Sequence, residues 1–371
     1  MFASLIAVLA APALGEPLRI ATYNTQLGRD GPGLLLRDLL RGDAQAKQVA
    51  AIVAHIAPDV LVLQDVDYDG DGLALAALSQ MIAEAGHALP YAFARLPNAG
   101  IATGLDMDGN GRTGEPRDAQ GYGRFAGAGG IAVLSALPID RGGVTDFSAL
   151  LWADLPGAIP PTKDGAPFPD AKAFAIQRLS SVAHWDIPLQ TRDGTVFHAF
   201  TWHGTPPVFD GPEDRNGRRN HDETALWLRY LDGALSTPPP DRPFVIVGSA
   251  NLDPVDGDGR PESLRALLGD PRLQDPQPRS AGGVRAAAQE GGQNATHQGD
   301  PAFDTANWPD ETPRDPGNMR VSYILPSTDW RVLDSGVFWP APNDPLHAML
   351  GAGDSTASRH RLVWVDVALA P

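Results

Sequence analysis

Short apolar runs bounded by polar residues recur along the chain, and they predict β-strands. Several runs alternate apolar and polar residues, as strands with one buried face do. The run at 244–247 (FVIV) is continuously apolar and ends in Gly248 and a polar cluster. This pattern indicates a buried strand that delivers side chains to a site at its carboxyl end. The predicted strands are residues 18–24, 60–66, 131–135, 173–187, 196–203, 244–251, 321–326, 330–339 and 360–368.

Apolar residues at helical spacing lie between these runs, at residues 43–56, 72–85 and 219–234. The third helix is predicted to begin near Asn220 as its N-cap, because Glu223 follows at the capping-box spacing. Strands and helices are mixed over the whole length without a linker, which favours a single α/β sandwich over two domains. Two stretches, 98–130 and 275–318, are rich in Gly, Pro, Asp, Asn and Gln. They predict long irregular loops, which are usually functional or mobile.

The composition narrows the class of protein. The 371 residues, 43% of them hydrophobic, are enough for one large core or two ordinary ones. A net charge of −16 and the lack of any Lys/Arg run argue against tight nonspecific binding to nucleic acid. The chain has no cysteine, which excludes disulfides, thiol nucleophiles and cysteine-based zinc sites.

Residues 1–15 (MFASLIAVLAAPALG) are apolar and short, and they end in small residues at a spacing that suits signal-peptidase cleavage. We therefore expect a signal peptide over 1–15 and export to the periplasm or the medium. The mature chain, residues 16–371, is expected to be a monomeric single domain without a transmembrane segment. A buried first strand or a trimmed gene start is the alternative, because the segment lacks an initial Lys or Arg.

Polar side chains stand at the ends of several predicted strands. Asn24 and Asp65 end the first two strands, His203 ends a central strand, and His360 opens the last. Amide and carboxylate oxygens suit a hard metal ion, and imidazoles suit proton transfer or contact with an oxyanion. Each residue also has a structural alternative, since an Asn at a strand end is most often a turn former.

The loop after His203 holds the densest mixture of acidic, basic and imidazole side chains in the chain. Its arginines suit bidentate contacts with phosphate. The alternative is a loop in which ion pairs and helix caps satisfy these charges internally. The arginines in question are Arg215, Arg218 and Arg219.

Two acidic stretches have the spacing of a calcium-binding loop. The first, residues 67–72 (DYDGDG), has no acid at the twelfth position. In the second, Asp106, Asp108 and Asn110 take the first ligand positions and Gly111 the sixth. A structural Ca²⁺ is expected there, although the twelfth position is a basic residue. For both stretches the alternative is a solvated acidic turn.

In their order and context these motifs resemble the endonuclease/exonuclease/phosphatase superfamily, over about residues 18–369. Asn24 in ATYN and Asp65 in LQD match the Asn and the LQE glutamate of that family. His203 matches a phosphate-contacting histidine, and the runs GSAN (248–251) and SRH (358–360) match the G-D-x-N and S-D-H motifs. The long polar loops are similar to those of an exported bacterial branch.

The resemblance implies an α/β (α+β) fold, a four-layered α/β/β/α sandwich of two packed mixed β-sheets flanked by helices. It also implies Mg²⁺ or another divalent ion at Asn24 and Asp65, phosphate contacts from His203 and Asn251, and acid–base chemistry at His360. The ligand would be a phosphorylated small molecule, a lipid head group or a nucleic acid. The residues expected to bind substrate are Arg215, Arg218, Arg219, Ser249 and Arg359.

Three acids of the family pattern are missing from this chain. Ser249 replaces the Asp that activates water, Ser322 replaces the Asp of an x-D-Y strand motif, and Arg359 replaces the Asp of S-D-H. Arg359 beside His360 is expected to lower the pKa of that histidine. The nearest candidates to supply the lost carboxylate are Asp67 and Asp253.

Three functions are compatible with these residues. The family implies a metal-dependent phosphodiester hydrolase, but loss of one member of a catalytic unit commonly costs several orders of magnitude in rate. The alternative is a catalytically inactive relative that binds an anionic or phosphorylated ligand, or a protein, in the bacterial envelope. The third is a calcium-stabilised exported domain without an active pocket. The missing acids favour weak hydrolysis.

Overall fold

A computed structural model describes residues 15–312, 314–351, 353 and 355–370. Residues 1–14 of the predicted signal peptide lie outside the described residues. Within the described part, no helix is long and apolar enough to cross a membrane.

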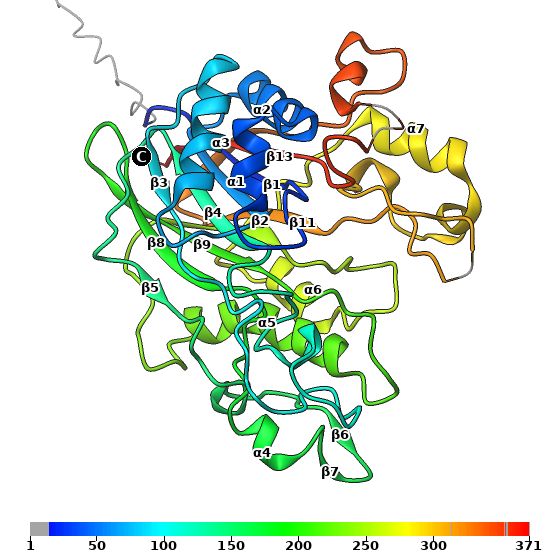
Figure 1. Cartoon of the computed structure of the whole chain (residues 1–371). Coiled ribbons are helices and arrows are strands. Elements are labelled where there is room, and N and C mark those ends of the chain that lie inside the picture. Colours follow the sequence, from blue (N-terminus) through cyan, green and yellow to red (C-terminus); the bar gives the residue numbers. More distant parts are fainter. Residues whose placement is uncertain (1–14, 313, 352, 354, 371) are drawn as a thin grey trace, which may run out of the picture.

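Two mixed β-sheets form the centre of the molecule (Figure 1). The first sheet, in spatial order, consists of β12 (Trp330–Val337), β13 (Val363–Leu369), β1 (Leu18–Asn24), β2 (Val60–Val66), β4 (Gly130–Ser135) and β3 (Tyr91–Phe93). The second sheet consists of β11 (Ser322–Pro326), β10 (Phe244–Ser249), β9 (Val196–His203), β8 (His184–Gln190) and β5 (Thr145–Asp146). A separate small hairpin joins β6 (Thr162–Lys163) to β7 (Ala166–Pro167).

Helices cover the outer face of each sheet (Figure 1). The first sheet is covered by α1 (Leu34–Leu40), α2 (Ala44–Ile56) and α3 (Leu73–Glu84), whose apolar residues share one core with it. The second sheet is covered by α5 (Arg215–Leu231) and α6 (Glu262–Leu268). The remaining helical segments are α4 (Ala171–Phe174), α7 (Ala281–Glu290), η1 (Pro116–Asp118), η2 (Trp152–Asp154), η3 (Gly292–Thr296), η4 (Pro301–Phe303) and η5 (Pro345–Leu350).

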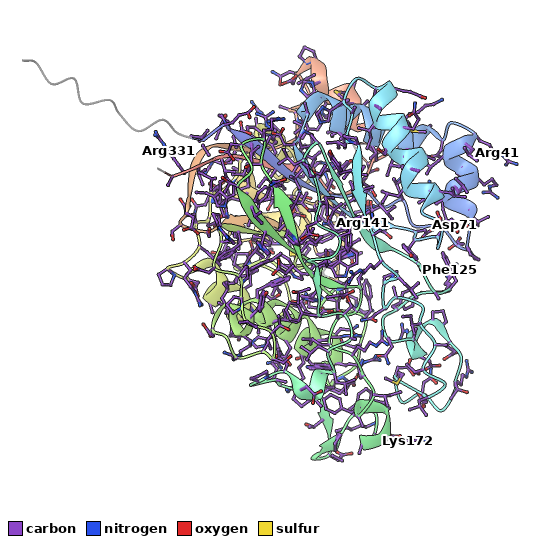
Figure 2. All side chains as sticks on the ribbon, turned by 90° about the vertical axis from the view of Figure 1, so that its left-hand side faces the viewer. Arg41, Asp71, Phe125, Arg141, Lys172 and Arg331 are labelled. Carbon is purple, nitrogen blue, oxygen red and sulfur yellow. The ribbon has the colours of Figure 1, made fainter. Side chains whose placement is uncertain are left out.

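The side chains of β10 show how the layers form. Val245 and Val247 belong to the core shared with the first sheet, whereas Phe244 and Ile246 belong to the core under α5 and α6. Successive side chains of a strand point to opposite faces, so a continuously apolar strand is buried on both. The predicted four-layered α/β/β/α sandwich is therefore confirmed. Side chains fill the space between the layers, while charged residues such as Arg41 and Lys172 project from the periphery (Figure 2).

Strand direction brings the polar strand ends together. β1 pairs in parallel with β2, and β9 pairs in parallel with β10, so each pair ends at the same edge of its sheet. The two pairs face each other, because β1 packs against β10 and β11. The segment before β13 closes this edge: the Ser358 hydroxyl donates a 2.8 Å hydrogen bond to the Asn24 carbonyl.

Apart from shifts of a few residues at other element ends, two predictions of secondary structure are wrong. The predicted strand 173–187 begins only at His184, because the Asp170 carboxylate accepts the Ala173 amide (2.8 Å) and starts the short helix α4 instead. The stretch 275–318 was expected to be irregular but contains α7. Its glycines serve packing: a Cβ at Gly282 would lie 2.2 Å from the Trp339 carbonyl oxygen.

Candidate functional site at the strand ends

His203 and Asn251 lie together at the ends of β9 and β10. The Asn251 amide nitrogen donates to the Gly204 carbonyl (2.8 Å) and lies 3.2 Å from His203 Nε2. Since that amide nitrogen can only donate, Nε2 accepts and the imidazole proton lies on Nδ1. Nδ1 is buried and has no hydrogen-bond partner among the described residues. Burial lowers the pKa of His203 to about 4, so the ring is neutral at pH 7.

His360 lies beside His203 and is also neutral. Burial lowers its pKa to about 3, and the nearby His203 and Arg361 contribute to the shift. The edge of its ring meets Trp308, with 5.3 Å between centroids, and its buried Nδ1 has no hydrogen-bond partner in the described part of the chain. Arg359 was predicted to lower the pKa of His360, and this prediction is wrong. Arg359 is exposed, and the cation that lowers the pKa is the buried Arg361.

Two serines face each other where the resemblance implies carboxylates. Ser249 and Ser322 are opposite each other across β10 and β11, and both are fully buried. The Ser249 hydroxyl donates to the Asn251 side-chain oxygen at 3.3 Å, whereas the Ser322 hydroxyl lacks a partner in the described structure. This part of the site therefore carries hydroxyl groups and no charge.

Neither candidate for the missing carboxylate reaches the histidines. Asp67 accepts the backbone amides of Arg29 (2.8 Å) and Gly129 (3.0 Å). Asp253 accepts the Arg320 amide at 2.7 Å and two amides of its own loop. Both acids hold loops in place, and the hypothesis that they replace the lost acid is not supported by their contacts.

Helix α5 holds the two loops that carry His203 and Asn251. The Asn220 amide donates to the carbonyls of Thr205 and Ala250, each at 2.6 Å. Glu223 is fully buried and accepts the amide of Thr205 (2.5 Å) on one oxygen and that of Ser181 (2.6 Å) on the other. The predicted capping box is therefore wrong: α5 begins at Arg215, and both polar residues lie inside it.

The three arginines predicted to bind substrate differ in their contacts. Arg219 is buried and donates to the carbonyls of Gln120, Arg178 and Leu179 at 2.6–2.8 Å, so its role is structural. Arg218 donates to the Ile159 carbonyl at 3.3 Å. Arg215 has no hydrogen bond or ion pair to any described residue.

Asn24 and Asp65 form the opposite side of the site, at the ends of β1 and β2. Asp65 is the extra residue of a bulge in β2 and has a left-handed backbone, with φ of 57°. Its carboxylate has no hydrogen bond to the described residues, and burial together with Asp67 raises its pKa to about 6. Mg²⁺ is commonly held by one or two carboxylates together with water and substrate phosphate. An unpaired carboxylate beside the amide of Asn24 fits such an ion.

A second acidic group lies in the loop that resembles a calcium site. One carboxylate oxygen each from Asp106, Asp108 and Asp118 lies within 4.8 Å of the others, so the three could hold a metal ion. Asp118 was missed from the sequence because η1 brings it back to the loop. The Asn110 amide donates to Asp108 (3.2 Å) and to Glu115 (2.6 Å).

Comparisons with known proteins agree with this fold. The model of the Endonuclease/Exonuclease/phosphatase family matches residues 21–360. Among curated proteins no match is found.

Among solved structures, an endonuclease/exonuclease/phosphatase from Beutenbergia cavernae is 17% identical, with a TM-score of 0.52 over 95% of this chain and 72% of that one. A family protein from Bacteroides thetaiotaomicron is 13% identical, with a TM-score of 0.50 over 97% and 100%. These likenesses show the fold.

Proposed function

Because the chain belongs to the Endonuclease/Exonuclease/phosphatase family, we propose that it binds a phosphorylated ligand at the strand ends and hydrolyses phosphoesters only weakly. We expect binding without efficient hydrolysis, because the residues that would contact phosphate, His203 and Asn251, are present. The acids that the family uses to activate water are replaced by Ser249 and Ser322. The ligand would be a phosphorylated small molecule, a lipid head group or a nucleic acid. The net charge of −16 makes nucleic acid the least favourable of the three.

One observation carries the proposal: the serine pair Ser249 and Ser322 stands beside two histidines whose Nδ1 atoms have no partner in the described residues. A general base works best when its pKa is close to the working pH. Both imidazoles have pKa values near 3 to 4, so they are weak bases at neutral pH. No carboxylate of the described residues hydrogen-bonds to either ring, so neither imidazole is oriented or made more basic.

The same groups suit the binding of phosphate. His203 offers an unpartnered N–H, and Asn251 fixes the ring that carries it. Asn24 and Asp65 would hold the divalent ion, and a bound ion would supply positive charge to the phosphate oxygens. Without that charge, the ionised Asp65 would repel the ligand. We therefore expect phosphate binding to require the metal.

The test measures binding and turnover separately on residues 16–371. Binding of inorganic phosphate is measured by calorimetry with and without Mg²⁺, and hydrolysis of bis-p-nitrophenyl phosphate with Mg²⁺, Mn²⁺ or Ca²⁺. We expect metal-dependent phosphate binding that is lost in His203→Ala, with turnover near background. The triple reversion Ser249→Asp, Ser322→Asp, Arg359→Asp should raise turnover by roughly 10²-fold or more.

A matched control is Ser335→Asp, which adds an acid to β12 away from the site. It should change neither binding nor turnover. Robust metal-dependent turnover by the native chain would overturn the claim of weak hydrolysis. Absence of phosphate binding in both the native chain and the reverted variant would overturn the ligand claim.

A further inference from the structure

Two loops leave the strand ends of the second sheet and lie side by side. Residues 204–214 follow β9, and residues 252–261 follow Asn251 at the end of β10. A Cβ built at Gly259 would lie 3.0 Å from Pro207 Cγ, so the two loops are in contact. Because β9 and β10 pair in parallel, both loops stand at the same edge of the sheet as the candidate site.

Both loops expose apolar side chains to solvent. Val208 is 37% exposed, Phe209 77% and Val255 52%, while Pro206 is exposed and Pro254 half-buried. A single exposed apolar residue is normal on a protein surface, but a group of them on adjoining loops indicates a surface that contacts an apolar partner. We call these five residues the apolar rim.

Phe209 is held in its exposed position by the backbone of its loop. Its φ is 69°, in the left-handed region that bulky residues rarely adopt. The residues on both sides are bound to the first turn of α5: the Asn216 side chain donates to the Val208 carbonyl (2.6 Å), and the Asn216 amide donates to the Asp210 carboxylate. The exposure of the ring is therefore built into the loop. Backbone of this uncommon kind clusters at ligand sites.

The charges on the two loops limit the kind of apolar partner. Residues 204–214 and 252–261 contain six acids and a single base, Arg260, which forms an ion pair with Asp214. Nucleic acid or an anionic membrane would be repelled by these acids. An apolar partner whose polar surface has no net charge suits them.

We propose that the apolar rim inserts into a membrane of zwitterionic phospholipid and brings the lipid head groups to the phosphate site. In such a membrane the phosphates lie directly over an apolar layer, just as the candidate site adjoins the apolar rim. A soluble phosphate ester would leave the rim in water, and nucleic acid would place further phosphates against the acids. This inference rests on the proposed phosphate site, and it narrows the ligand to one of the three classes given above.

The test measures binding of residues 16–371 to phosphatidylcholine vesicles by co-sedimentation with Mg²⁺. The apolar segment 1–15 is left out, because it would bind vesicles by itself. The native chain should bind these vesicles roughly threefold more tightly than vesicles that also contain phosphatidylserine. Phe209→Ser should bind about tenfold more weakly, because the ring no longer enters the apolar layer, and Val255→Ser should show a smaller loss. The control Leu40→Ser removes a side chain on α1 that is 73% exposed, and it should behave like the native chain.

Calorimetry with inorganic phosphate and Mg²⁺ separates the two proposals. Phe209→Ser should keep the native affinity for phosphate, because its ring is not part of the phosphate site. If the native chain binds phosphate but no vesicles, the inference fails while the phosphate site stands. If it binds no phosphate, the phosphate site fails and the inference fails with it.

Three further outcomes would overturn the membrane contact. The first is equal vesicle binding by Phe209→Ser and the native chain, and the second is an equal loss in Phe209→Ser and Leu40→Ser. The third is a dimer of the native chain in sedimentation that Phe209→Ser converts to a monomer, since a second copy of the chain would then cover the apolar rim.

Discussion

The two halves of the candidate site differ in charge. At the ends of β1 and β2, Asp65 keeps a carboxylate that has no partner among the described residues. At the ends of β9 and β10, the positions for acids are Ser249 and Ser322, and His203 and His360 are neutral. Burial favours the neutral form in both halves, since it raises the pKa of the acid and lowers those of the imidazoles.

This difference indicates which part of phosphoester hydrolysis each half of the site can support: binding of the metal ion or activation of water. A lone buried carboxylate gains from a cation, so the first half still suits metal binding. In the second half, His203 and His360 are weak bases at neutral pH, and no carboxylate of the described residues hydrogen-bonds to either ring. The proposed function therefore depends on both sheets for ligand binding and predicts that the second half limits hydrolysis.

The largest expected effect concerns the rigidity of the second half. Glu223→Ala leaves the buried amides of Ser181 and Thr205 without an acceptor, which should destabilise the fold by about 3 kcal/mol. It should also weaken phosphate binding, because the loop after His203 loses an anchor. Urea unfolding and phosphate calorimetry measure the two effects. Glu223→Gln keeps one acceptor and should lie between the native chain and Glu223→Ala.

The control for this prediction is Glu84→Ala. Glu84 is exposed at the end of α3 and accepts only the Gln80 side chain. Its removal should change stability by less than about 0.5 kcal/mol. If Glu223→Ala is as mild as Glu84→Ala, then α5 does not hold the second half in place.

The charge of the first half is tested by Asp65→Asn. This change removes the only carboxylate proposed to hold the divalent ion, so Mn²⁺ affinity should fall roughly 100-fold, or about 2.7 kcal/mol. The exposed Asp71→Asn serves as the control and should leave the affinity unchanged. Calorimetric titration with Mn²⁺ measures both. Equal affinity in the native chain and Asp65→Asn would place the metal elsewhere and break the division into two halves.

The neutrality of the second half predicts a pH dependence of stability. His203 and His360 have folded pKa values of about 4 and 3, below the unfolded value of about 6.5. The unfolded chain therefore binds more protons below pH 6.5, and stability is lost as the pH falls from there. Each histidine should contribute at most about 2 kcal/mol of this loss at pH 5.

Urea unfolding at pH 7.5 and pH 5 measures that loss. His360→Gln cannot be protonated and should unfold with a smaller difference between the two pH values. Another buried histidine, His184, opens β8 opposite Trp202 and has a pKa of about 4, so it contributes to the slope in both chains. An identical slope in His360→Gln would mean that His360 is not buried in its neutral form.

The sequence predicts the strands of this fold better than the contacts of its site. The strands 18–24, 60–66 and 196–203 were predicted to the residue, because each apolar run has polar neighbours that end it. The gathering of strand ends at one edge follows from the sheet order that the family implies. α7 was missed because its two glycines, which indicate a loop, instead allow close packing, Gly282 against Trp339 and Gly283 against Pro301.

Polar contacts with distant backbone have no sequence signature. Asn220 and Glu223 fit a capping box by spacing, yet their partners are loops at Ser181, Thr205 and Ala250. The three arginines at the start of α5 (Arg215, Arg218 and Arg219) look equivalent in sequence, and only the carbonyls around Arg219 distinguish it from Arg215. Such partners are set by tertiary packing and carry no periodicity of their own.

The smallest expected effect concerns the acidic loop outside the site and tests whether it binds a structural Ca²⁺. Asp106, Asp108 and Asp118 come together in one loop, whereas Asp65 is the acid proposed to hold a cation at the strand ends. If this loop holds Ca²⁺, millimolar Ca²⁺ should stabilise the fold by roughly 1–2 kcal/mol, which is about 1–3 °C in melting temperature for a chain of this length. Asp118→Asn should abolish the gain, and the exposed Asp30→Asn should keep it. Since Asp65 lies in the site, Asp65→Asn should also keep it. A gain that disappears in Asp65→Asn and persists in Asp118→Asn would assign the calcium effect to the site and leave the loop as a solvated turn.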